Sequence, residues 1–205
     1  MKTRILIMLC MMGLEGCFEV PLQDALRQLK SPAYAQSFTT DNHRIEVRLV
    51  PAILRVLQQA HLDSTRILTH RLIDSLMPQG ITYGTTFILK LSPKDSASSP
   101  GIAHDVIYGN ISGYPNYQET LKAYQTGLAD KIWLEVNGKK IPMLNYEMEN
   151  TFGMDPSRSF MLLFPDLETS EKSIQVKLVL DDIVPGLGRK KLDWNLPVGK
   201  YEKIL

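Results

Sequence analysis

Apolar and polar residues alternate along much of the chain, and this alternation predicts strands. Between residues 44 and 50, Ile45, Val47 and Leu49 fall on one side of an extended backbone, as in a half-buried strand. Similar runs follow, separated by segments rich in Gly, Pro, Asp and Ser. We predict strands at 44–50, 82–91, 159–164, 173–180 and 191–196, and a weaker pattern extends over 103–112.

The clearest local signal is a β-hairpin. Asn137-Gly138 separates the apolar run Ile132–Val136 from Lys139–Met143. Asn-Gly readily adopts the positive φ angles of a two-residue hairpin turn. We therefore predict two antiparallel strands joined at Asn137-Gly138.

Helical periodicity is found in two neighbouring segments and a third, shorter one. Ile53 and Val56 recur at helical spacing in the segment 51–60, and a second apolar run of this kind extends over 64–77. We predict that these two helices form a helical hairpin docked on a sheet. A short helix is also predicted at 116–126.

Together these elements predict a mainly β fold. The expected architecture is a β-sandwich, immunoglobulin-like in architecture, with an N-terminal helical hairpin inserted at about 51–77. We assign residues 43–205 to this domain. The preceding segment, 17–42, is predicted to be a tether, because Ser31-Pro32 stops a short helical pattern and the residues after it are polar.

The first sixteen residues are organised like a secretory signal peptide. Lys2 and Arg4 form a short positive region, and the ten residues from Ile5 to Leu14 carry no charge. That stretch is shorter than the roughly 20 apolar residues that a membrane-spanning helix needs. We expect residues 1–16 to be removed on export.

The signal segment ends in Leu14-Glu15-Gly16-Cys17, which resembles the lipobox of bacterial lipoprotein precursors. The resemblance implies cleavage before Cys17, a diacylglycerol thioether on its sulfur and acylation of its new amine. Two or more such chains anchor a protein stably to a membrane. Glu15 departs from the small or hydroxylated residue usual at its position. Phe18 stands where the inner-membrane retention signal of enteric bacteria has aspartate, which implies outer-membrane sorting in an organism with two membranes.

Charge and cysteine content exclude several classes of function. Lys and Arg number 23 against 22 for Asp and Glu, so no strong field attracts nucleic acid. The cysteines are Cys10 and Cys17, so the domain after Cys17 has neither a disulfide nor a cysteine-ligated zinc site. The covalent lipid on Cys17 is the one attached group that the sequence predicts, with no other cofactor.

No local pattern predicts an active site. The four histidines, at positions 43, 61, 70 and 104, are scattered and lack the spacing of a metal site. Loop tyrosines can stack on sugars or anchor a protein partner, and four of them fall close together in a segment rich in Gly and Pro. These candidates for a binding surface are Tyr108, Tyr114, Tyr117 and Tyr124. Core packing is the alternative role for their rings.

A basic triplet, Arg189–Lys191, follows two glycines near the C-terminus. The glycines lack the spacing of a phosphate-binding loop and precede a predicted strand, so we interpret them as turn residues. The triplet is expected to form a solvated strand edge that discourages edge pairing, with contact to anionic head groups as the alternative.

These observations predict a membrane-anchored envelope lipoprotein that acts as a non-catalytic binding or structural module. Its partner would be an envelope protein or glycan, in addition to the membrane that holds its anchor. A carrier of an apolar ligand, such as a lipid tail enclosed by the helices, is a second hypothesis. A third is an envelope enzyme whose site is assembled from distant residues, with His70 or His104 as base.

Overall fold

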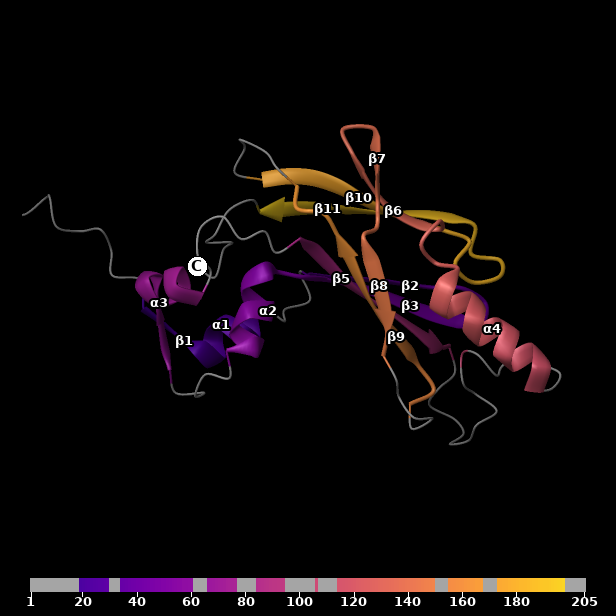
Figure 1. The fold of residues 1–205 in the computed structure, drawn as a ribbon, viewed down its shortest axis with the longest axis horizontal. Helices are drawn as coiled ribbons and strands as arrows, with labels where there is room; N and C mark the ends of the chain where they lie inside the picture. Colours follow the sequence, from indigo (N-terminus) through magenta and orange to yellow (C-terminus); the bar gives the residue numbers. More distant parts are fainter. Residues whose placement is uncertain are drawn as a thin grey trace, which may run out of the picture.

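Two antiparallel sheets packed face to face make up most of the protein (Figure 1). The computed structural model describes residues 19–29, 34–60, 66–76, 84–94, 106, 114–149, 155–167 and 173–197. The five-stranded sheet has the order β2 (Ala35–Thr39), β3 (His43–Val50), β5 (Thr85–Pro93), β9 (Arg158–Phe164), β8 (Asn145–Met148). The four-stranded sheet has the order β11 (Arg189–Pro197), β10 (Ser173–Asp181), β6 (Ile132–Val136), β7 (Lys139–Pro142). The predicted mainly β sandwich is confirmed.

The alternation of the strands decides which side chains fill the space between the sheets. Ile45 and Val47 on β3 are fully buried, as are Phe87 and Leu89 on the neighbouring β5. Phe87 contacts Trp194 of the opposite sheet, with 5.7 Å between ring centroids. Side chains of both sheets thus form one continuous core.

The predicted hairpin forms as the sequence indicates. Asn137 has a φ of 50° and Gly138 a φ of 76°, which are the positive angles of a two-residue hairpin turn. Strands are also present at the predicted positions 44–50, 82–91, 159–164, 173–180 and 191–196. The ends of the observed strands differ from the predicted ends by three residues or fewer. Apart from Val106, the weaker strand pattern at 103–112 lies outside the described residues.

The segment predicted to be a tether contains secondary structure. Within 17–42 the structure has β1 (Glu19–Pro21), α1 (Leu22–Leu29) and β2, the last of which is an edge strand of the five-stranded sheet. The helical spacing after Pro21 is real, because Leu22 and Ala25 are buried against other helices. The tether prediction is corrected for these residues.

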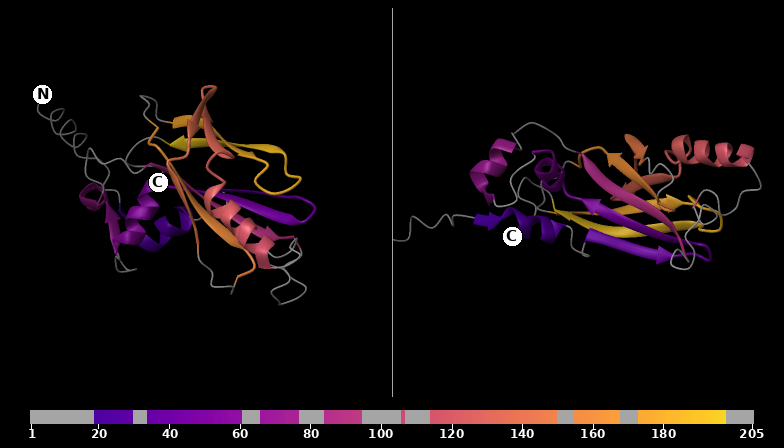
Figure 2. Two further views of the ribbon diagram at one scale, coloured as in Figure 1. Left: turned by 45° about the vertical axis from the view of Figure 1, so that its right-hand side comes forward. Right: turned by 90° about the horizontal axis from the view of Figure 1, so that it is seen from below.

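A second, smaller apolar core lies at one end of the molecule (Figure 2). Here α1 packs with α2 (Ala52–Gln59), α3 (His70–Leu76) and β4 (Ile67–Thr69), and β4 pairs antiparallel with β1. The predicted helix at 64–77 is therefore shorter than expected. Its start is set by the Thr69 hydroxyl, which accepts a hydrogen bond from the Leu72 amide at 3.2 Å, as an N-cap residue does.

The assignment of inward and outward faces on β5 makes a stability prediction that two neighbouring residues can test. Phe87 is fully buried, whereas the next residue, Ile88, faces outward with 37% exposure. Phe87→Ala should lower the free energy of unfolding by about 3–5 kcal/mol, since it leaves a cavity between the sheets. Ile88→Ala should cost about 1 kcal/mol or less. Denaturant unfolding measures both, and equal losses would contradict the assigned faces.

Candidate functional site

The outward face of the four-stranded sheet presents a tryptophan. Ile132 and Leu134 point into the core and are fully buried, so Trp133 between them points outward. Trp133 lies opposite Val179 of β10 in the strand register, and the Val179 side chain is fully buried. The ring is half-buried and stands in the middle of a sheet rather than on a loop.

Two cations hold the Trp133 ring in place. The Lys140 ammonium lies 4.1 Å from the ring centroid, and the Arg189 guanidinium carbon lies 5.5 Å from it. Both distances are within the range of cation–π attraction. Lys140 comes from β7 and Arg189 from β11, which are the two edge strands of this sheet.

Two ion pairs order the charges around the ring. The Arg189 guanidinium makes two contacts with the Asp181 carboxylate, at 3.2 and 2.7 Å. Lys191 donates to Glu135 at 2.8 Å. We call this group the Trp133 surface, and its members are Trp133, Glu135, Lys140, Asp181, Arg189 and Lys191.

These ion pairs shift the protonation equilibria of their members. The hydrogen bond from Arg189 is the main reason that the pKa of Asp181 is lowered, and the same bond raises the pKa of Arg189. The hydrogen bond from Lys191 likewise lowers the pKa of Glu135. Asp181, Glu135 and Arg189 therefore keep their charges over a wider pH range than they would as isolated side chains.

The Trp133 surface contains side chains of the types that are common at binding interfaces. It combines an aromatic ring with charges of both signs on one face of the sheet. Within the described residues, no carboxylate lies within ion-pair distance of Lys140. The arrangement also suits the predicted role of Arg189–Lys191 as a guarded edge, because β11 is an edge strand.

The predicted tyrosine cluster divides into parts. Tyr124, on α4 (Tyr114–Thr126), is buried and its ring lies 5.9 Å from that of Phe160, so it is a core residue. Tyr117 is half-buried against the same core. Tyr108 and the side chain of Tyr114 lie outside the described residues. A binding role for these two and for Tyr117 stays a prediction.

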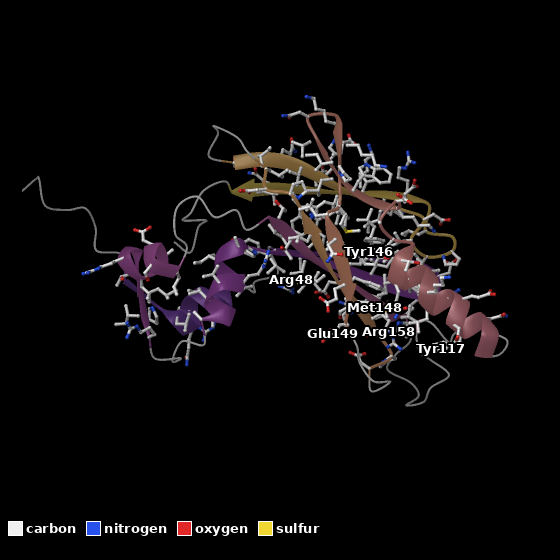
Figure 3. All side chains as sticks on the ribbon, viewed as in Figure 1. Arg48, Tyr117, Tyr146, Met148, Glu149 and Arg158 are labelled. Atoms are coloured by element: carbon white, nitrogen blue, oxygen red, sulfur yellow. The ribbon has the colours of Figure 1, made fainter. Side chains whose placement is uncertain are left out.

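A buried arginine lies near Tyr117 at the same end of the sandwich (Figure 3). Arg158 is 6% exposed and donates to the carbonyls of Asp155 and Ser157, at 2.8 and 2.9 Å. The Asp155 carboxylate accepts from the Ser157 amide, which is the main reason that its pKa is lowered. These bonds fix the turn before β9, which is a structural role.

The histidines give no support for a metal or catalytic centre. His43 is buried at the start of β3, and desolvation lowers its pKa. His61, His104 and the side chain of His70 lie outside the described residues, as does Cys17. No group of three His, Cys, Asp or Glu side chains suited to a metal occurs in the described part of the chain. In the same part, no helix has the length and apolar character to span a membrane.

Comparison with known proteins identifies no family. No family model matches the chain, and no curated protein matches it. One similar solved structure is the crystal structure of a DUF4426 family protein from Pseudomonas aeruginosa PAO1, with 8% identity and a TM-score of 0.33. The match covers 80% of this chain and 94% of that chain. A TM-score this low supports no argument about fold or function.

Acid should weaken the Trp133 surface in a residue-specific way. The folded pKa of Asp181 is below its unfolded value of about 3.9, so its stabilising effect is present above that pH and is lost as pH falls through the folded pKa. When the pH is lowered below about 4, the urea concentration at the unfolding midpoint should therefore decrease for the wild type. The decrease should be smaller for Asp181→Asn, which has no carboxylate at this position to titrate.

Asp182→Asn is the matched control for this titration. It keeps the side-chain oxygen that accepts from the Gly188 amide, and it leaves the Asp181–Arg189 pair intact. Its midpoint should follow the wild-type pH dependence. Identical profiles for all three proteins would show that the Asp181–Arg189 pair contributes nothing to stability.

Proposed function

We propose that the protein is an envelope lipoprotein, anchored through lipid on Cys17, that works as a non-catalytic binding module. The partner is a protein surface that carries carboxylates, and the Trp133 surface binds it. The observation that carries this proposal is the tryptophan fixed between Lys140 and Arg189 on the outward face of the four-stranded sheet.

The anchor part of the proposal draws on the N-terminal sequence. Leu14-Glu15-Gly16-Cys17 follows a charged start and an apolar segment too short to span a bilayer. Cys17 provides the thiol for a thioether lipid, and Phe18 favours the outer membrane where two membranes exist. An anchored protein needs no spanning helix, since two or more acyl chains hold it stably.

An immunoglobulin-like architecture is part of the same proposal. The orders β3-β5-β9-β8 and β11-β10-β6-β7 correspond to strands A-B-E-D and G-F-C-C′ of immunoglobulin domains, with β2 added beside β3. The helices α2 and α3 then form a hairpin-like insertion between strands A and B. In antibody domains the strand C tryptophan is buried, whereas Trp133 on the corresponding strand faces outward and Trp194 occupies the core.

Several features of the Trp133 surface favour a protein partner. Tryptophan and arginine are over-represented among residues that dominate binding energy at interfaces. The bidentate bond to Asp181 restricts Arg189, so less side-chain entropy is lost on binding. Small molecules are usually bound in concave pockets, whereas the outward face of a sheet suits a broad protein surface. Lys140 is placed to pair with a carboxylate of that partner.

The mass of the membrane-bound protein tests the anchor. The form isolated from membranes should lack residues 1–16 and should carry diacylglycerol and acyl mass. Cys17→Ser should remain unprocessed and unlipidated, because it has no thiol to modify. An unmodified wild-type protein recovered in the soluble fraction would refute the anchor.

Photo-crosslinking in intact cells tests the binding surface. Pro142 is exposed and lies opposite Trp133 in the register of β6 and β7, so a photoreactive residue placed there should capture the partner. Adding Trp133→Ala should lower the yield by about tenfold or more, as expected for a residue that dominates an interface.

Two controls separate specific binding from general loss of structure. Ile88→Ala changes an exposed residue on the other sheet and should leave the yield at position 142 unchanged. A photoreactive residue at Met161, also exposed on that sheet, should give no adduct of the same mass. Adducts that form at 161 but not at 142 would show that the partner binds the five-stranded sheet, which would contradict the proposed binding surface.

A further inference from the structure

Strand β1 lies very close in sequence to Cys17, and it pairs with β4. We call Glu19–Pro21 and Ile67–Thr69 the β1–β4 ribbon. Only Phe18 separates Cys17 from Glu19, and two residues of chain span at most about 7 Å. The Cα atom of Cys17, where a lipid would be attached through the side chain, is therefore within about 7 Å of the ribbon whatever the conformation of that link.

The face of the ribbon that is turned away from the second core carries an apolar pair at one end, Ile67 and Pro21, and a polar pair at the other, Thr69 and Glu19. Leu68 is fully buried in the second core, so its neighbours on β4 point to the opposite side. Ile67 is 49% exposed, which is unusual for a large apolar residue beside a packed core. Its partner across the ribbon is Pro21, which is also exposed.

The ribbon is fixed to the domain rather than loosely attached. The Leu22 amide, directly after β1, donates to the Arg66 carbonyl directly before β4 at 2.9 Å. Leu22 and Ala25 on α1 are buried in the second core together with Leu68. An anchor at Cys17 would therefore set the orientation of the domain as well as its location.

Charge near the ribbon plays a smaller part. Arg66 and Arg71 are exposed on either side of β4 and can reach lipid phosphates. Glu19 on the ribbon itself and Asp74 on α3 are acidic, and Asp24 on α1 pairs with Arg27 at 3.6 Å. The apolar pair Ile67 and Pro21 is therefore the main feature that suits a lipid surface.

We infer that the outward face of the β1–β4 ribbon, centred on Ile67, rests on the membrane and orients the domain. The inference depends on the proposed lipid anchor at Cys17. It places α1, α2 and α3 next to the bilayer, and it places α4, at the opposite end of the long axis, away from it (Figures 1 and 2).

The absence of cysteine after Cys17 makes this orientation measurable. In the lipidated protein the Cys17 sulfur is consumed, so Ile67→Cys provides a single free thiol for a fluorophore. Lys122→Cys, at an exposed position on α4, is the matched control. Each labelled protein is placed in phosphatidylethanolamine and phosphatidylglycerol vesicles that contain a lipid with a quencher near the head group.

The label at 67 should lose about half or more of its emission, because an apolar face inserts ~5–10 Å into the interfacial region. The label at 122 should lose almost none. Lipidated protein with equal quenching at both positions, or more at 122, would overturn the inference and leave the anchor intact. If the emission of the label at 67 changes with the number of protein molecules per vesicle but not with the quencher lipid, a second copy of the protein covers the ribbon. That result would also overturn the inference. Protein without lipid mass would refute the anchor itself.

Discussion

The packing of Phe87 against Trp194 joins the two sheets, and the rest of the structure depends on this contact. Phe87 also meets Phe164 edge-on, with 6.0 Å between centroids, so three large rings lie together in the core between the sheets. Large buried aromatic rings contribute much of the apolar area that stabilises a core. Every strand that borders these rings must turn alternate residues inward, and the residues between them are left to face solvent. The outward direction of the half-buried Trp133 follows from the same alternation.

Sequence patterns predicted the long strands because the burial of their residues repeats with a period of two. They also predicted the turn at Asn137-Gly138, where backbone conformation depends on two residues only. The short strands outside this hairpin, β1, β2, β4 and β8, were not predicted. In β2, Phe38 is the large apolar residue among small and polar neighbours, and in β4 the buried Leu68 fits helical spacing as well as strand spacing. Pairing with β1 decides for the strand, and that pairing is a tertiary effect.

The Trp133 surface could not be predicted for a related reason. Lys140 and Arg189 are far apart in sequence, and they meet over Trp133 only because the strand order is β11-β10-β6-β7. The sequence does show a basic triplet beginning at Arg189, and the structure places it on an edge strand. An edge of this kind needs charge to prevent pairing with other strands. The same charges, once fixed by Asp181 and Glu135, surround an aromatic ring, so protection of the edge and recognition can share one set of residues.

The ordered N-terminal segment changes what an anchor at Cys17 would do. A flexible tether would let the domain turn freely, with a reach that grows with the number of residues. Here β1 begins two residues after Cys17 and is held by the second core, so the dimensions of the folded domain set the reach. Trp133 follows α4 at the start of β6, and Asp181 and Arg189 flank the turn at the α4 end of the four-stranded sheet (Figure 1). A domain held at its helical end would therefore present the Trp133 surface at a fixed height above the bilayer. A partner of matching height could then bind without the loss of conformational entropy that a flexible tether would undergo.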